Sequence, residues 1–206
     1  MHEDHGAAPP TSDGPDAMSM HQLGELLRSL RRDANMTLQE LAERSGVSTG
    51  LISQIERGQG NPAYNTLIKL AQALGVKVGE FFGGPEPESH AGAHSAGLVR
   101  ADQRRRLLLT ERDMVYELLT PSMRGRLGVI RAQIAAGWSN ESVPYRHDGE
   151  ECIVLISGRL SVVVGSDRYE LEEGDALTYD ASIPHWYANI TPEPAVIIGA
   201  TTPPSF

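Results

Sequence analysis

The chain has 206 residues, of which 40% are hydrophobic, 22% charged and 5% aromatic, so it can bury a mainly aliphatic core and is not disordered throughout. It contains no apolar run near 18 residues and no basic-then-apolar leader, which predicts a soluble cytoplasmic protein with no membrane span. The single cysteine, Cys152, excludes an intrachain disulfide and a zinc site built from several thiolates.

Net charge differs between parts of the chain. The overall value of −9 argues against nucleic-acid binding, because phosphate groups are neutralised by Lys and Arg. Residues 19–82, however, carry seven basic and six acidic residues, a net charge of +1, and the excess of acidic residues lies outside them. DNA binding therefore remains open for that segment.

Composition divides the chain into four segments. Residues 1–18 contain prolines and scattered acidic residues without apolar periodicity, which predicts a disordered tail. Residues 83–97 are rich in glycine and proline and predict a linker. We expect an all-α domain over 19–82 and an all-β domain over 98–206.

Five short helices are predicted in the first domain. Ser19 with Gln22, and Thr37 with Glu40, have the spacing of capping boxes, in which side chains satisfy backbone amides at a helix start. Asn61 followed by proline predicts another helix start. The glycines expected to end helices are Gly46, Gly58 and Gly75.

Apolar residues at helical spacing predict one buried face for each helix. The residues expected to point inward are Leu23, Leu26, Leu27, Leu30, Leu51, Ile52, Ile55, Leu67, Leu70, Ala71, Leu74, Phe81 and Phe82. These helices should form a compact five-helix bundle.

Beyond the linker the pattern changes to short runs of Val, Ile, Leu and Tyr separated by Gly, Asp and Pro. Short strands at such spacing are typical of an all-β sandwich or barrel. The predicted strands are 114–119, 127–135, 152–156, 160–164, 168–172, 176–179, 186–190 and 195–201.

The segment from Leu38 to Arg57 resembles the helix-turn-helix of phage-repressor (XRE-type) regulators. The resemblance rests on Ala42, where two helices approach closely, on Gly46 in the turn, and on Ile52 and Ile55, which pack the second helix. In such regulators the third helix of the domain enters the major groove. The resemblance therefore implies DNA binding.

Nine residues are candidates for DNA contact. Gln54 can pair bidentately with adenine, and Thr49 offers a hydroxyl and a methyl group to base edges. The candidates for base reading are Ser48, Thr49, Gly50, Ser53 and Gln54, and those for phosphate contact are Thr37, Gln39, Arg57 and Asn61. Because one head of almost zero net charge should bind weakly, we expect a homodimer on a palindromic double-stranded operator.

Residues 145–158 resemble the first cupin motif, and residues 174–189 resemble the second. The resemblance implies a small antiparallel jelly-roll barrel whose mouth binds a divalent metal ion or a small molecule. Carried over by position, the usual metal ligands are Tyr145, His147, Glu151 and His185, so that a tyrosine replaces the first histidine.

Two interpretations of this site remain open. The set of His147, Glu151 and His185 suits Fe(II), Mn, Ni or Zn with open coordination positions. Alternatively, a metal-free pocket uses these residues and Tyr145 to bind an organic effector. Further candidates for effector binding are Tyr116, Arg131, Gln133, Tyr179 and Trp186, although alternation does not decide which face of a strand is inward.

Two other features have structural interpretations. Cys152 follows Glu151, so on a strand it points to the opposite face, where we expect a buried small hydrophobic residue. The basic run from Arg104 to Arg106 is expected to be solvated or to contact another subunit.

Three functions from different classes fit these features. The leading hypothesis is a DNA-binding transcriptional regulator whose cupin domain senses a small-molecule metabolite and modulates operator binding. The second is a mononuclear non-heme iron enzyme of the hydroxypropylphosphonate-epoxidase type. Asn35 stands where that enzyme supplies a substrate-binding lysine, which favours a regulator with no catalytic residues. The third is a cupin domain that only dimerises the DNA-binding heads.

Overall fold

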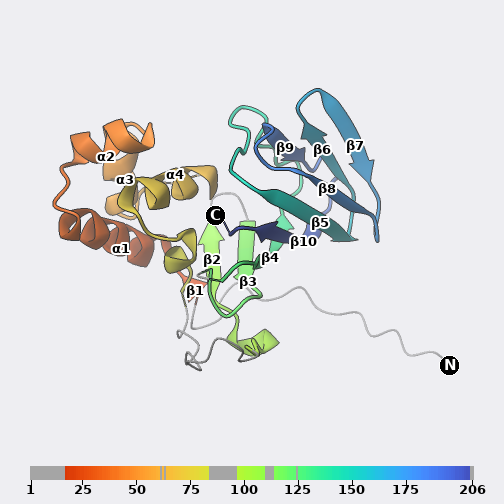
Figure 1. The fold of residues 1–206 in the computed structure, drawn as a ribbon, viewed down its shortest axis with the longest axis horizontal. Coiled ribbons are helices and arrows are strands. Elements are labelled where there is room, and N and C mark those ends of the chain that lie inside the picture. The colour runs from red at the N-terminus through yellow and green to blue at the C-terminus, as the bar shows by residue number, and fades with distance from the viewer. Residues whose placement is uncertain are drawn as a thin grey trace.

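The computed structural model describes residues 17–60, 62, 64–83, 97–109, 114–123 and 125–204. The helices occupy the N-terminal part of the described chain and the strands the C-terminal part (Figure 1). The predicted order of an all-α part followed by a largely antiparallel β part is therefore confirmed.

Four α-helices form the N-terminal part: α1 (Met20–Asp33), α2 (Leu38–Ser45), α3 (Thr49–Glu56) and α4 (Tyr64–Leu74). The prediction of a fifth α-helix is wrong, because η1 (Val78–Phe81) is a single 3-10 turn of four residues. Gly79 in this turn lies so close to the β part that an added Cβ atom would be 2.7 Å from Cγ of Met123. Packing against the β part therefore shapes this segment more than its helix propensity.

Local sequence signals place the ends of the helices correctly. Both capping boxes are present, with Ser19 accepting from the amide of Gln22 and Thr37 from the amide of Glu40. Gly46 follows α2 with a φ of 67°, a left-handed conformation that glycine adopts without strain. The expected cap at Asn61 lies outside the described residues.

The expected inward faces are largely correct. Leu26, Leu30, Leu51 and Leu74 are half-buried, and the other residues expected to point inward are buried. Helices α1 and α3 cross closely at Gly24, where an added Cβ atom would lie 2.3 Å from the carbonyl oxygen of Ile55. Only glycine, which has no Cβ atom, allows the two helices to approach so closely.

The second part contains two sheets. The first has the order β1-β2-β3-β4-β10-β5-β8, and the second the order β7-β6-β9. The strands are β1 (Ala17–Met18), β2 (Arg106–Leu109), β3 (Met114–Leu118), β4 (Gly128–Ile134), β5 (Glu150–Ser157), β6 (Leu160–Val164), β7 (Asp167–Leu171), β8 (Ala176–Asp180), β9 (His185–Ala188) and β10 (Ala195–Thr202). A short 3-10 helix, η2 (Ala101–Gln103), precedes β2.

All eight predicted strands are present, but two further strands were missed. Strand β1 lies within the segment predicted as a disordered tail and pairs in parallel with β2. Regular structure is thus already present at Ala17, two residues before the predicted start at Ser19, and residues 1–16 lie outside the described residues. Of the predicted linker, Gly83 pairs with Arg106, and residues 84–96 lie outside the described part.

The basic run before β2 is neither solvated nor unpaired in this chain. Arg104 and Arg106 form ion pairs with the buried carboxylate of Glu117, at 3.1 and 2.9 Å, and Arg131 reaches the same carboxylate at 3.5 Å. Arg105 donates two hydrogen bonds to the carbonyl oxygen of Phe82. The expectation of a solvated run is corrected, because Arg104 and Arg106 surround one acid and Arg105 binds a backbone carbonyl. A contact of this run with another subunit stays a prediction.

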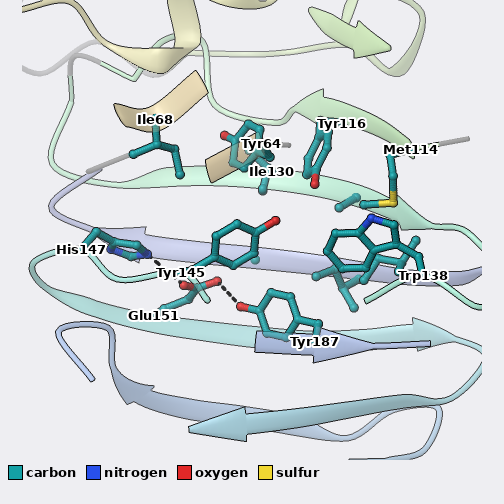
Figure 2. A pocket seen from close by; sticks show the side chains of 14 residues that line it. Tyr64, Ile68, Met114, Tyr116, Ile130, Trp138, Tyr145, His147, Glu151 and Tyr187 are labelled. Carbon is teal, nitrogen blue, oxygen red and sulfur yellow. Dashed lines mark hydrogen bonds and ion pairs between the residues drawn. The ribbon is translucent and has the colours of Figure 1, made fainter. Parts of the chain in front are cut away.

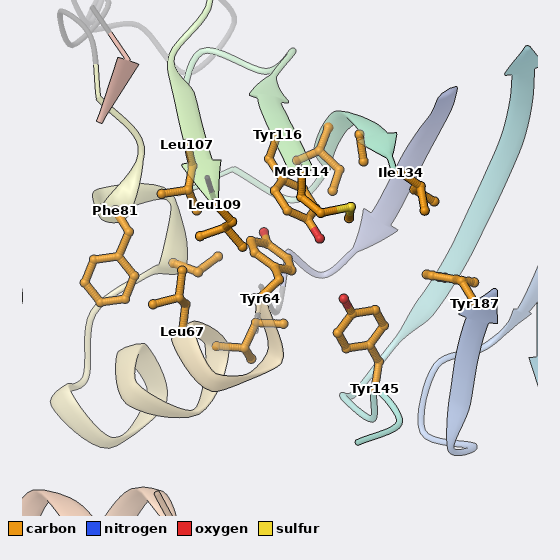
Figure 3. Close-up of a cluster of buried hydrophobic side chains, with 14 of the residues drawn as sticks. Tyr64, Leu67, Phe81, Leu107, Leu109, Met114, Tyr116, Ile134, Tyr145 and Tyr187 are labelled. Atoms are coloured by element: carbon orange, nitrogen blue, oxygen red, sulfur yellow. The ribbon is translucent and has the colours of Figure 1, made fainter. Parts of the chain in front are cut away.

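Both parts share one hydrophobic core. Figure 3 shows side chains of the helical part, among them Leu67 and Phe81, close to Leu107 and Leu109 of the β part, with Tyr64 between the two groups. Lys77 also donates to the carbonyl oxygen of Pro204, near the C-terminus. The helices are therefore seated on the end of the first sheet and are not held by the linker alone.

Two predictions from single residues can be judged here. Cys152 points away from the face of Glu151, as expected from alternation, but it is half-buried and not buried. No helix among the described residues combines the length and apolar character needed to cross a membrane.

Candidate functional site: a reading helix and a metal-ligand pocket

The first candidate site is the exposed side of α2 and α3. Thr49, Gly50 and Gln54 of α3 are exposed, and Ser53 between them is half-exposed. Gln54 makes no side-chain hydrogen bond to a described residue, so its amide is available to a base edge. The residues expected to read bases thus share one accessible face of one helix.

The candidates for phosphate contact surround this face. Thr37 is the exposed N-cap of α2, as Ser48, a candidate for base reading, is of α3. Gln39 is exposed and donates to Glu43 at 2.9 Å. Arg57 directly follows α3 and donates to Ser53 and, at 3.1 Å, to Gln59. These side chains are tied down locally, which holds their polar groups in place beside the reading face.

The second candidate site is a buried cluster in the β part, formed by His147, Glu151 and His185. Their potential ligand atoms lie within 4.8 Å of one another, and each residue is at most 6% exposed. Glu151 comes from β5, His185 from the start of β9, and His147 from the loop before β5. Figure 2 shows His147 and Glu151 side by side. Folding therefore unites three residues that the sequence separates by up to 38 positions.

Both imidazoles present Nε2 to the carboxylate. Nε2 of His147 is 3.2 Å and Nε2 of His185 is 3.5 Å from Oε2 of Glu151. Each Nδ1 lies near a backbone carbonyl, that of Asp148 at 3.2 Å and that of Ile183 at 2.9 Å. A carbonyl partner at Nδ1 holds the proton there and leaves the Nε2 lone pair for a ligand, which is the usual support of metal-binding histidines.

Glu151 is held as a carboxylate. Burial raises its pKa, but the interactions with His147 and His185 outweigh burial and lower the pKa of Glu151 to about 2. Its other oxygen, Oε1, accepts a hydrogen bond of 3.0 Å from the hydroxyl group of Tyr187. That hydroxyl group also bonds to Tyr179, so a chain of phenols orients the carboxylate.

The cluster fits a divalent cation. Nε2 of His185 is buried and makes no well-formed hydrogen bond to any described residue. Nε2 of each imidazole and Oε2 of Glu151 converge. With the proton of each ring on Nδ1, the lone pairs of both Nε2 atoms and of the carboxylate oxygen face one another. Such an arrangement needs a proton or a metal ion between the groups, and an N₂O set suits Fe, Mn, Ni or Zn.

A pocket adjoins the cluster. It has a volume of about 30 Å³, enough for about two water molecules. Its lining is mostly apolar and aromatic and consists of Tyr64, Ile68, Met114, Tyr116, Ile130, Ala132, Ile134, Trp138, Tyr145, His147, Glu151, Tyr187, Ile197 and Gly199. Figure 2 shows His147 and Glu151 on one side of this pocket and Tyr64 and Ile68 of α4 on the other, with Tyr145 between them.

Only some of the predicted effector residues reach this pocket. Tyr116 and Tyr145 line it. Burial, and to a lesser extent the neighbouring Tyr116, raises the pKa of Tyr145, so its phenol remains neutral. Tyr179 is buried behind His185, with ring centroids 4.9 Å apart, and does not line the pocket.

Three predicted effector residues point elsewhere. Arg131 and Gln133 are half-buried and lie on the other face of β4, where Arg131 pairs with Glu117. The ring of Trp186 packs under the guanidinium group of Arg168, and the ring centroid lies 5.1 Å from Cζ of Arg168. The expectation that these three line the pocket is corrected, since the inward face of each strand carries the intervening residues.

The sequence contains a signal for some of the missed lining residues. From His185, a period of two predicts that Tyr187 and not Trp186 faces the cluster. On β4, the apolar Ile130, Ala132 and Ile134 mark the inward face in the same way. Nothing in the sequence predicts Tyr64 and Ile68, because they belong to the helical part.

Comparison with known proteins gives a match for the helical part and a match for the β part. The helix-turn-helix family model matches residues 27–81, and the cupin domain model matches residues 131–200. The HTH-type transcriptional regulator SutR of Escherichia coli (strain K12) is 27% identical over 81% of this chain and 86% of its own length. The uncharacterized HTH-type transcriptional regulator y4dJ of Sinorhizobium fredii is 47% identical over 29% of this chain and 78% of its own. The chain is a helix-turn-helix transcriptional regulator with a cupin domain.

A solved structure has the same arrangement as this regulator. The HTH_3 family transcriptional regulator from Vibrio cholerae aligns with a TM-score of 0.66 and 24% identity, over 90% of this chain and 97% of that one. The alternative of an iron enzyme receives no support. Asn35 is exposed in the turn after α1, with a left-handed φ of 54°, and does not line the pocket.

Proposed function

We propose that this regulator binds a palindromic operator as a homodimer, and that its cupin pocket holds a divalent metal ion and senses a small molecule. The observation that carries the proposal is the buried cluster of His147, Glu151 and His185, which opens on an apolar pocket in the same chain as an exposed reading helix. Residues 19–82 form the DNA-binding domain and residues 98–206 the sensor domain in this proposal.

The DNA-binding part acts through α3. Ser48, Thr49, Gly50, Ser53 and Gln54 contact base edges in the major groove, while Thr37, Gln39, Arg57 and Asn61 contact phosphates. A domain with a net charge of +1 neutralises few phosphates, so one head alone binds weakly. Two heads on two half-sites, about 10–10.5 base pairs apart, supply the missing affinity.

The sensor part acts through the metal-ligand cluster. His147, Glu151 and His185 hold the ion, with Tyr187 and the two backbone carbonyls as supports that orient the ligands. A bound ion supplies open coordination positions for a polar group of the effector. Tyr116, Tyr145 and the apolar walls contact the rest of the effector.

Sensing changes operator affinity through the relative stability of two conformations. A ligand shifts such an equilibrium only as far as its affinities for the two states differ. Coupling energies of about 1–3 kcal/mol, or about 5–150-fold in affinity, are usual for regulators.

One experiment tests the metal and effector parts together. Purified protein is examined by native mass spectrometry with elemental analysis, and its operator, selected from random DNA, is then titrated with and without fractionated cell extract. We expect a substoichiometric divalent metal and an extract fraction that changes operator affinity. Protein without any metal, whose operator affinity no fraction changes, would show that the cupin domain is not a sensor.

A further inference from the structure

The wall of the pocket opposite the metal-ligand cluster belongs to the DNA-binding domain. Tyr64 and Ile68 occupy successive turns of α4, are 4% and 3% exposed, and line the same pocket as His147 and Glu151. The helical match of the comparisons, residues 27–81, includes both residues, and the cupin match does not. The sensor pocket is therefore incomplete without the DNA-binding domain.

We propose that Tyr64 and Ile68 are ligand contacts of the cupin pocket, and that a ligand larger than the present cavity acts on the DNA-binding domain by displacing α4. This inference rests on the proposed sensing function and names the residues through which it reaches DNA. It also names the ligand class: a compact molecule with a polar end toward the cluster and an apolar body toward α4.

The size of the cavity favours displacement. A volume of about 30 Å³ accommodates about two water molecules, so a metabolite of more than a few heavy atoms fits inside the pocket only if part of the wall moves. Much of the remaining wall lies on paired strands: β4 and β5 both pair with β10 over most of their length. Among the backbone hydrogen bonds between described residues, none joins α4 to these sheets, whereas side-chain contacts such as the stacking of Tyr64 on Tyr116 do.

The contacts of Tyr64 show what would move. Its ring stacks on Tyr116 of β3, with centroids 4.4 Å apart, and meets Phe82 edge-on at 6.5 Å. Helix α4 packs on α2, and α2 packs on the reading helix α3. Packed helices shift as rigid units between discrete arrangements, so a displacement of α4 changes the position of α3 relative to the sheet.

Such a shift affects operator binding because a dimer must place two reading helices about one turn of DNA apart.

The chemistry of the walls supports the ligand class. No Lys or Arg side chain is among the residues that line the pocket, while four tyrosines, one tryptophan and several aliphatic residues are. The indole nitrogen of Trp138 is buried without a hydrogen-bond partner in the described chain and offers one donor to a ligand.

The experiment fills the pocket from the opposite side and needs no identified ligand. Gly199 of β10 lines the pocket, and an added Cβ atom there would meet its nearest neighbour, Oε1 of Glu151, at 3.7 Å, an ordinary contact. The variant Gly199→Leu therefore fits its own strand and extends a side chain into the cavity. The adjacent Ala200→Leu, on the opposite face of β10, is the matched control.

Full-length variants are compared by their affinity for the operator selected with wild-type protein. We expect Gly199→Leu to change the dissociation constant by about tenfold, within the usual range for allosteric coupling, and Ala200→Leu to leave it unchanged. Adding Tyr64→Ala makes room for the leucine, so the double variant should return to within about threefold of the Tyr64→Ala single variant, a direct measure of coupling between the two positions.

Two results would overturn the inference. One is a folded Gly199→Leu protein with wild-type operator affinity. The other is a change that persists in the double variant, which would mean that it reaches the DNA by another route. If Gly199→Leu does not fold, the smaller addition Ala132→Val on β4 fills the pocket from a third side and is judged by the same comparison.

The wild-type response to cell extract, measured in parallel, separates this inference from the proposed function. If extract changes operator affinity but pocket filling does not, the regulator senses a ligand without displacing α4. If neither changes operator affinity, the sensing function itself fails.

Discussion

The ring of Tyr64 in helix α4 stacks on the ring of Tyr116 in strand β3, with centroids 4.4 Å apart and planes inclined by 15°. Tyr64 belongs to the helical part, within the helix-turn-helix match, and Tyr116 to the β part, ahead of the residues that the cupin model matches. Because both rings are buried and both line the pocket, the two parts do not have separate cores. Damage to the pocket at this contact should therefore also affect the helical part.

Replacing Tyr64 with Ala should destabilise both domains. Removal of a buried aromatic side chain costs about 3–5 kcal/mol, and here the lost contacts lie on both sides of the domain boundary. We expect wild-type protein to unfold in one calorimetric transition and Tyr64→Ala to show a lower midpoint or two separate transitions. The control Tyr169→Ala removes a tyrosine that is 39% exposed on β7 and should have little effect. Two transitions already present in wild type would contradict the shared core.

Replacing His185 with Ala should weaken metal binding strongly. The change removes one of three converging ligands and leaves the other two unable to hold the ion firmly. Isothermal titration with Zn²⁺ or Ni²⁺ should show a loss of affinity of about tenfold or more. His21, an exposed histidine on α1, supplies the control variant His21→Ala. Equal metal affinity in both variants would show that the cluster is not the metal site.

Tyr145→His should tighten metal binding. Tyr145 and His185 face each other in an antiparallel bridge, with hydrogen bonds of 2.7 and 2.9 Å between their backbones, so their side chains lie on the same side. A histidine at position 145 would add an imidazole beside the cluster, and we expect an affinity gain of about tenfold. Chelator should remove the metal from wild type without unfolding it. No gain in Tyr145→His, together with no metal in wild type, would favour a metal-free effector pocket.

The stability of metal-free protein should depend on Glu151 in acid. Burial raises the pKa of Glu151, but His147 and His185 lower it overall, from 4.5 to about 2. Since the folded-state pKa is the lower one, the carboxylate stabilises the fold fully above pH 4.5, and this contribution, of the order of 3 kcal/mol, is lost as the pH falls toward 2.

Urea unfolding of chelated protein between pH 2 and 5 measures this dependence. The variant Glu151→Gln should lack this part of the pH dependence, whereas Glu170→Gln, at an exposed position of β7, should retain it. Parallel curves for wild type and Glu151→Gln would mean that the histidines do not stabilise the carboxylate.

Two substitutions in and beside the reading helix should weaken DNA binding in different ways. Gln54→Ala removes an exposed amide that can pair with adenine, and should cost about 1–3 kcal/mol at one base position only. Arg57→Ala removes a cation at the end of α3, and should weaken all sequences alike and flatten the dependence of binding on salt. Binding assays with operator variants at several salt concentrations separate the two effects. The same sequence-independent loss in both variants would refute the assignment of α3 to the major groove.

The sequence by itself was sufficient for most features that depend on neighbouring residues, the fifth helix and the first two strands excepted. Capping boxes at Ser19 and Thr37, the glycine turn at Gly46 and eight strands were all predicted correctly, because caps, turns and alternation act over a few residues. The three metal-ligand candidates were also predicted, by resemblance to a motif, and the structure brings them together.

Only the tertiary structure decided which faces of the strands are inward and what closes the pocket. Arg131 and Trp186 were expected in the pocket but lie on outer faces, because burial on one face of a strand depends on what the sheet packs against. Tyr64 is separated from Tyr116 by 52 positions and belongs to the other domain, so no local pattern relates the two rings. Their contact arises from the packing of a helix against the end of a sheet, and such packing is a property of the folded chain as a whole.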